Sequence, residues 1–158
     1  MANVKTNVMR ILDKAKIAYE MTSYEATDGK IDGNSVAQKI HKPKEQVFKT
    51  LVTMGHSKLN YVFVIPVDAE LDLKKASKAV GEKSMEMIPQ KELLKTTGYI
   101  HGGCSPIGMK KLFPTTIHMS AQVLSEMTFS AGKVGYQVTV APSVLEELVK
   151  AKFADIIK

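Results

Sequence analysis

The chain has 158 residues, of which 44% are hydrophobic and 24% are charged, and its formal net charge is +6. This length and composition are typical of one globular domain, spanning residues 1–158, that buries a core without disulfide bonds. Cys104 is the single cysteine, which excludes an internal disulfide, and no apolar run approaches the roughly 18 residues of a transmembrane helix. Since the N-terminus also lacks the apolar core of a signal peptide, we expect a cytoplasmic protein that does not contact a membrane.

The positive charge favours a polyanionic partner, because binding phosphates releases the counterions condensed around them. A surface of solvated lysines explains the same charge without any partner. Arg10 is the only arginine among 22 lysines and arginines. Lysine attracts phosphate as a point charge but reads base edges less well than the arginine fork does. If the partner is a nucleic acid, the composition therefore favours recognition of shape and backbone over base sequence.

Hydrophobic spacing in the first half of the chain predicts two short helices and three strands. A polar loop at 25–33 contains two Asp-Gly turn signals, and Asn34 after it caps the second helix. Residues 55–58 form a hairpin loop between the clearest strand pair, and the second strand of that pair is apolar on both faces, which places it centrally in a sheet. In chain order, the expected elements are a helix over 4–15, a strand at 19–24, a helix over 34–40, and strands at 47–54 and 59–67.

The second half predicts three more helices and four more strands. Asp72 caps a helix that Gly81 ends, and Pro89 opens another, with Leu93 and Leu94 facing inward, that ends at Gly98. Pro142 begins the last helix. Strands are expected around 85–87, 115–119, 127–130 and 136–140, the last two joined by a hairpin turn at 131–133.

The order of elements mixes hairpins with helices, so strict alternation of strand and helix does not fit. The expected fold class is therefore α+β. Its sheet is mixed and mostly antiparallel, open or closed into a barrel-like form, with helices packed outside it.

The standard catalytic machinery is missing from the sequence. There is no phosphate-binding loop, no nucleophile-elbow serine and no pair of metal ligands at helical spacing, so we expect neither a metal nor a cofactor. The four histidines, His41, His56, His101 and His118, follow no ligand spacing, and each is read as a surface or loop residue. An enzyme with this sequence must work without a conventional triad or metal ion.

Lys49 departs from the apolar pattern of its strand. Alternation puts it on one face with Val47 and Leu51, while Phe48 and Val52 occupy the other. If the sheet is covered, the lysine lies among apolar side chains and needs an anionic or polar partner. The alternative, which the pattern alone favours, is an edge-strand lysine that prevents aggregation.

The segment 97–108 contains four glycines and a proline, which permit unusual backbone angles and a close approach of the backbone to a ligand. Its free N–H groups could bind an oxyanion or a phosphate, and the alternative is a purely structural turn. Cys104 lies in this segment, but no histidine is fixed beside it in the sequence. We therefore interpret Cys104 as a small buried thiol and not as a nucleophile.

These two features together resemble a known family. The strand Phe48-Lys49-Thr50-Leu51, followed by Gly98-Tyr99 and the run from Gly102 to Lys111, is similar to the YbaK/EbsC family. That family comprises bacterial Cys-tRNA(Pro) deacylases related to the editing domain inserted in prolyl-tRNA synthetases. The stretch from Ser130 to Gly135 resembles its Ser-Gly-Gly-Lys-Arg-Gly region, so the resemblance covers essentially the whole chain.

The resemblance implies a mixed β-barrel flanked by helices, with Lys49 as the essential lysine at its pocket. It implies that Lys49 positions the substrate and that backbone amides of Gly102, Gly103 and Ser105 stabilise an oxyanion. The substrate-binding residues that it implies are Tyr24, Ile31, Thr50, Cys104, Pro106, Ile107, Gly108, Ser130 and Gln137. The chain departs from the family at two positions: Gln137 stands where many relatives have aspartate or serine, and Val134 replaces the usual arginine.

The activity implied by the resemblance is removal of cysteine from mischarged Cys-tRNA(Pro), with the thiol of the substrate as nucleophile, which explains the missing triad. The implied partners are tRNA and prolyl-tRNA synthetase. One alternative keeps the fold and changes the substrate to Ala-tRNA(Pro), with a ribose hydroxyl or a water in place of the thiol. Another is a noncatalytic RNA-binding or regulatory protein.

Overall fold

The computed structural model describes residues 4–158. Within them the chain forms five α-helices: α1 (Asn7–Lys14), α2 (Gly33–Lys39), α3 (Leu73–Val80), α4 (Gln90–Thr97) and α5 (Pro142–Val149). The strands are β1 (Glu20–Ser23), β2 (Phe48–Gly55), β3 (Asn60–Pro66), β4 (Met85–Met87), β5 (Thr115–His118), β6 (Met127–Ser130), β7 (Tyr136–Val140) and β8 (Lys152–Ala154). Two short 3-10 helices, η1 (Lys44–Gln46) and η2 (Met119–Val123), complete the order.

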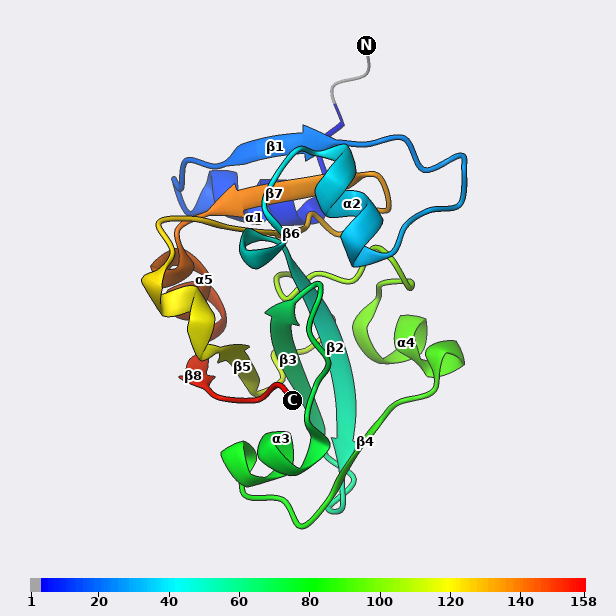
Figure 1. The fold of residues 1–158 in the computed structure, drawn as a ribbon, viewed down its shortest axis with the longest axis vertical. Helices are drawn as coiled ribbons and strands as arrows, with labels where there is room; N and C mark the ends of the chain where they lie inside the picture. Colours follow the sequence, from blue (N-terminus) through cyan, green and yellow to red (C-terminus); the bar gives the residue numbers. More distant parts are fainter. Residues whose placement is uncertain (1–3) are drawn as a thin grey trace.

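The strands form two sheets (Figure 1). An antiparallel sheet has the order β1-β7-β6, and a mixed sheet has the order β4-β2-β3-β5-β8, in which β5 runs parallel to both β3 and β8. The predicted central strand is β3, which lies in the middle of the mixed sheet with almost every residue buried. The expected α+β class, with mixed and antiparallel pairing and helices outside, is confirmed.

The two sheets meet at the start of β2. An isolated parallel bridge joins Val47 to Thr128 on β6. Figure 1 shows the antiparallel sheet at the top and the mixed sheet below it, with the start of β2 of the mixed sheet close to β6. The largest core cluster fills the space between the sheets and the helices α1 and α5, and Phe129, Ile117 and Leu145 within it are fully buried. The residues just after Val47 therefore lie where both sheets contribute side chains.

Capping residues explain where the helices begin and end. Oδ1 of Asp72 accepts hydrogen bonds from the backbone N–H groups of Lys74 and Lys75, both at 3.0 Å, and Gly81 ends α3 in the left-handed region with φ of 77°. This helix is as predicted. The cap predicted for α2 at Asn34 is wrong, because Asp32 accepts the bond from the N–H of Ser35 at 3.1 Å, which leaves Asn34 inside the first turn.

Other differences from the expected elements have physical causes. Leu94 was expected to face inward but is 55% exposed, since neighbouring residues on a helix point about 100° apart and Leu93 takes the inward position. The strand β8 was not predicted, because three residues carry too little pattern and its pairing with β5 joins distant parts of the chain. Among residues 4–158, no helix has both the length and the apolar character needed to cross a membrane.

His118, at the end of β5, binds the segment that follows β8. The expectation of a surface or loop histidine is wrong here: His118 is 7% exposed in the strand, and its Nδ1 accepts a hydrogen bond from the backbone N–H of Ile156 at 3.3 Å. Burial lowers the pKa of His118, an effect that nearby Asp155 opposes and Lys75 reinforces. The folded chain therefore holds His118 neutral, because a protonated Nδ1 could not accept this hydrogen bond.

We expect the free energy of unfolding to decrease as the pH falls below about 6.5, the ordinary histidine pKa, because the unfolded chain then binds a proton that the folded chain resists. Above that pH this contribution is fully present. Urea titrations between pH 8 and pH 5 measure the effect. His118→Asn, which retains an acceptor near Nδ1 but does not titrate, should flatten the pH dependence.

The matched control is His41→Asn, because His41 is exposed and its φ of 58° is one that asparagine tolerates. It should leave the pH dependence unchanged. A slope that survives in His118→Asn would assign the pH dependence to other groups.

Candidate active site

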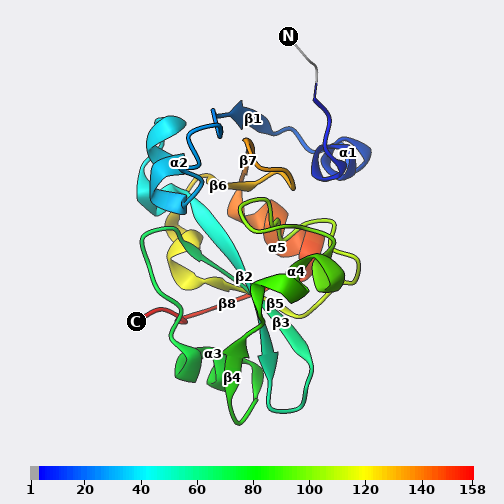
Figure 2. The same cartoon turned by 90° about the vertical axis from the view of Figure 1, so that its right-hand side faces the viewer.

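A cavity of about 320 Å³ lies where the two sheets meet. Figure 2 shows α2 and α4 on either side of β2. These three elements supply walls of the cavity, together with the β6–β7 pair and the segment 98–108, which we call the glycine-rich loop. The residues that line it are Ile31, Asp32, Gly33, Val36, Val47, Phe48, Lys49, Thr50, Leu51, Val67, Leu93, His101, Gly102, Cys104, Ser130 and Gln137. Seven of the predicted site residues are thus brought together: Ile31, Lys49, Thr50, Gly102, Cys104, Ser130 and Gln137.

The start of β2 supplies the cationic group of this cavity. Lys49 is half-buried, and within residues 4–158 its ammonium makes no hydrogen bond or ion pair. Strand β4 pairs only with residues 53–55 of β2, so Lys49 lies beyond that pairing and lines the cavity. Beside it, Oγ1 of Thr50 is buried and has no hydrogen-bond partner among the described residues. The ammonium of Lys49 and the hydroxyl of Thr50 are therefore both free to bind a ligand. For the buried hydroxyl, a ligand would also remove the cost of leaving a donor without a partner.

The β6–β7 pair supplies two polar side chains to another wall of the cavity. Ser130 and Gln137 face each other across the pair, and both are buried. The hydroxyl of Ser130 accepts a hydrogen bond from the N–H of Gly132 at 3.1 Å, which fixes the hairpin turn. With Gln137 in place of an acid, this wall is polar but carries no charge.

The glycine-rich loop fits into the site only because it lacks side chains. A Cβ on Gly102 would lie 2.8 Å from Cδ1 of Ile31, and one on Gly103 would lie 3.1 Å from the backbone nitrogen of Val134. The N–H of Gly103 donates to the carbonyl of Ile100 at 3.0 Å and is therefore occupied. The N–H groups of Gly102 and Cys104 have no such partner within residues 4–158, and both residues line the cavity.

The other predicted site residues lie outside this cavity. Ser105 is fully buried, and its hydroxyl accepts from the N–H of Ile107 at 3.3 Å, as in a turn. Pro106, Ile107 and Gly108 line a separate cavity of about 240 Å³ on the α1 and α5 side of the loop. Tyr24 packs against the apolar cluster behind the cavity wall, and its hydroxyl is buried without a partner among the described residues.

Cys104 is close enough to the cavity to line it, but its thiol is poorly suited to attack a substrate. Burial raises the pKa of Cys104 to about 12, and a hydrogen bond with Thr97 opposes this only in part. The thiol is therefore protonated near neutral pH, whereas the thiolate is the nucleophilic form. Within residues 4–158, moreover, no group of three or more His, Cys, Asp and Glu side chains could hold a metal ion.

Several lining residues were not predicted from the sequence. Asp32 brings a carboxylate to the cavity, and hydrogen bonds from Ser35 lower its pKa. Gly33 is required next to it, because a Cβ there would lie 2.5 Å from Cβ of Val67. The signal that could have found Asp32 is the serine three residues later, which makes it a helix cap. His101, an exposed residue at the cavity, follows no sequence signal at all.

Comparisons with known proteins identify relatives of this chain. The aminoacyl-tRNA editing domain family matches residues 32–148. A proposed Cys-tRNA(Pro)/Cys-tRNA(Cys) deacylase of Enterococcus faecalis, EbsC, is 45% identical over 152 residues, which are 96% of this chain and 93% of the relative. A proline–tRNA ligase of Paraburkholderia xenovorans is 25% identical over 131 residues, 80% of this chain and 22% of the ligase.

The fold also has a solved counterpart. The crystal structure of a proposed trans-editing enzyme for prolyl-tRNA synthetase matches with a TM-score of 0.85 at 22% identity, covering 99% of both chains. The family match over most of the chain and the 45% identity to EbsC lead to one conclusion. The chain belongs to the aminoacyl-tRNA editing domain family.

Proposed function

We propose that this chain removes cysteine from tRNA, with mischarged Cys-tRNA(Pro) and also Cys-tRNA(Cys) as substrates. The observation that carries the proposal is the cavity at the sheet junction. Within residues 4–158, it combines a lysine and a buried hydroxyl that have no partner with free backbone amides, and its cysteine thiol is not activated. Its volume of about 320 Å³ is at the lower end of small-molecule sites, which fits an amino acid and part of a ribose. The 45% identity to EbsC supports cysteine as the amino acid.

In the proposed mechanism the substrate supplies its own nucleophile. The cysteine sulfur attacks the ester carbonyl carbon and its proton is lost, and the bond from that carbon to the terminal ribose oxygen breaks. The ribose oxygen leaves with a proton, giving free tRNA and a cyclic thiolactone. Lys49 positions the substrate and stabilises negative charge near the ribose, and the N–H groups of Gly102 and Cys104 are the proposed oxyanion donors.

The partner of the proposed reaction is tRNA, and residues 1–158 act as one editing domain in the cytoplasm. With Arg10 as its only arginine, the chain has few groups able to read base edges. We therefore propose that tRNA selectivity is supplied in part by prolyl-tRNA synthetase bound to the same tRNA.

A turnover assay tests the proposal directly. Catalytic amounts of the chain should release free tRNA(Pro) and cysteine-derived thiolactone from Cys-tRNA(Pro), many times per molecule of protein. Faster release from Ala-tRNA(Pro) than from Cys-tRNA(Pro) would assign the alanine-specific activity instead. Binding of tRNA with no turnover of either substrate would make the chain a noncatalytic RNA-binding protein.

Affinity for tRNA should depend steeply on salt and little on base sequence, because contacts from lysine to phosphate dominate a surface of this composition. Between 50 and 200 mM salt we expect a loss of about tenfold or more, measured by titration with uncharged tRNA. Two tRNAs of different sequence serve as controls for each other and should give similar slopes. An affinity that is nearly constant over this range would mean that the net charge of +6 has no part in binding.

A further inference from the structure

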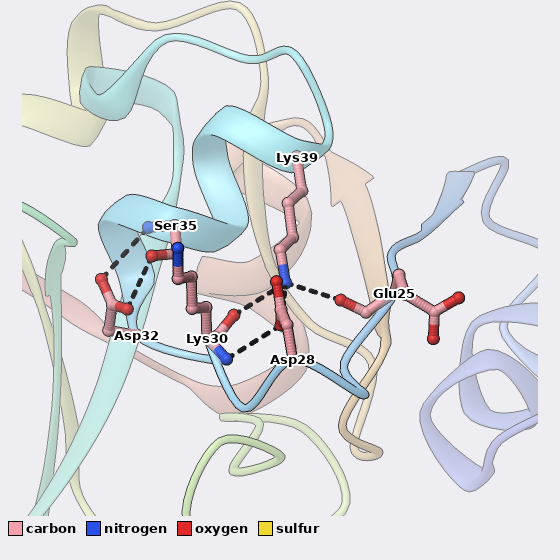
Figure 3. Close-up of polar contacts among 6 residues, drawn as sticks. All are labelled: Glu25, Asp28, Lys30, Asp32, Ser35 and Lys39. Carbon is pink, nitrogen blue, oxygen red and sulfur yellow. Dashed lines mark hydrogen bonds and ion pairs between the residues drawn. The ribbon is translucent and has the colours of Figure 1, made fainter.

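One ammonium group holds the loop between β1 and α2 (Figure 3). Nζ of Lys39 donates to the carbonyl oxygen of Glu25 at 2.6 Å, to the carbonyl oxygen of Lys30 at 3.0 Å and to Oδ1 of Asp28 at 2.8 Å. These three acceptors use all the donors that a lysine ammonium has. Because Glu25 and Lys30 lie at the two ends of the loop, Lys39 ties both ends to the same point.

The ammonium is itself anchored to a well-packed helix. Lys39 is in the last turn of α2, its side chain is 21% exposed, and α2 buries Val36 and Ala37. On the loop, Asp28 also accepts a hydrogen bond from the N–H of Lys30, and Lys39 lowers the pKa of Asp28. The carboxylate therefore stays ionised at neutral pH, which keeps this contact charge-assisted.

This loop ends at the wall of the cavity. Ile31 follows Lys30 directly and lines the cavity, and its Cδ1 lies 2.8 Å from the position that a Cβ on Gly102 would take. At the other end of the loop, Nζ of Lys39 lies 5.8 Å from the centre of the Tyr24 ring. The position of Ile31 against the glycine-rich loop thus depends on a backbone that Lys39 holds.

We propose that Lys39 is a positioning residue that sets the width of the cavity between Ile31 and Gly102, and with it the selectivity for a small amino acid. Lys39 does not line the cavity, so it acts through the loop and not on the substrate. Without it, the two carbonyls and the carboxylate lose their common donor, and the loop gains conformational freedom. Ile31 then no longer limits the cavity, and a bulkier amino acid such as proline is admitted. The inference rests on the proposed function.

The test compares Lys39→Met, which retains length but not the donors, with Lys42→Met. Lys42 is a matched control, since its side chain is 13% exposed and pairs with Glu20 at 2.9 Å and Glu126 at 3.7 Å, away from the cavity lining. In Lys39→Met we expect the ratio of affinities for non-hydrolysable cysteinyl and prolyl adenosine amides to fall by about tenfold, the scale of discrimination by pocket size. For Cys-tRNA(Pro) itself, kcat should stay within about threefold of the wild type, because Lys39 does not touch the substrate.

Further variants keep the inference testable if Lys39→Met does not fold. Lys39→Arg retains the charge and donors and should recover part of the selectivity, and Asp28→Asn, which weakens one contact, should show a smaller loss. Unchanged selectivity in a folded Lys39→Met protein whose loop amides exchange faster would overturn the inference. An equal loss in Lys42→Met would also do so, because it would show a general effect of removing a lysine.

Binding of non-hydrolysable aminoacyl adenosine amides separates this inference from the proposed function. If the wild type binds the cysteinyl amide more tightly than the prolyl amide but cleaves no ester, the deacylase proposal fails. The role of Lys39 is then still decided by the ratio of the two affinities in Lys39→Met. A wild type that does not distinguish the two amides would overturn the inference itself.

Discussion

Replacing Lys49 with alanine should lower deacylation of Cys-tRNA(Pro) by about 10²- to 10³-fold, the loss seen when one stabilising donor is removed from an oxyanion site. Lys49 lines the cavity and its ammonium has no partner within residues 4–158, so the fold does not depend on its charge. Alanine fits a half-buried strand position. We therefore expect a folded protein, with the loss mainly in kcat, as measured by single-turnover release of tRNA and by urea unfolding.

The matched control for this experiment is Lys44→Ala, which removes an exposed lysine from the neighbouring η1 helix outside the cavity lining. It should leave turnover within about twofold. Turnover at the wild-type rate by a folded Lys49→Ala protein would remove Lys49 from the mechanism, whereas an unfolded variant would call for Lys49→Met, which retains the packing of the side-chain stem.

Exchanging cysteine for serine on the tRNA should reduce the rate by about 10²-fold or more, because a hydroxyl is a far weaker nucleophile than a thiol near neutral pH. Cys104→Ala, in contrast, should keep most of the activity. Burial raises the pKa of Cys104 to about 12, so little thiolate is available at this position, and alanine leaves only a small cavity. Rates on Cys-tRNA(Pro) and Ser-tRNA(Pro), measured with both proteins, check the two expectations together.

Mass spectrometry of the protein during turnover distinguishes attack by the substrate thiol from attack by the thiol of Cys104. If the substrate thiol attacks, no covalent intermediate forms and mass spectrometry should find unmodified Cys104 during turnover. An aminoacyl adduct on Cys104, together with loss of activity in Cys104→Ala, would assign the attack to the protein.

Patterns of neighbouring residues predicted most of the helices and strands, because short-range interactions determine where these elements begin and end. The cap at Asp72, the stop at Gly81 and the continuous apolar run of β3 each depend on a few neighbouring residues. The division of the strands into two sheets was not predictable in this way. It depends on pairings such as β1 with β7 and β5 with β8, which join residues far apart in the chain.

The candidate site was predictable only in part for the same reason. Lys49 and Gly102 stood out from their surroundings, and the family resemblance supplied Thr50, Ser130 and Gln137. The wall formed by Asp32 and Gly33 depends on how α2 approaches the strand that ends before Val67, a tertiary contact without a local signal. The family resemblance also predicted a residue that the cavity does not contain: it placed Ser105 in the site, but the Ser105 hydroxyl accepts a hydrogen bond within the turn.

The bridge between Val47 and Thr128 has a consequence for how the protein loses activity. The cavity takes one wall from β2 of the mixed sheet and another from β6 and β7 of the antiparallel sheet. Unfolding of either sheet therefore removes one wall of the cavity and, with it, the activity. Catalytic rate thus serves as a probe of global unfolding, and along a urea titration the loss of turnover should coincide with the loss of far-ultraviolet circular dichroism.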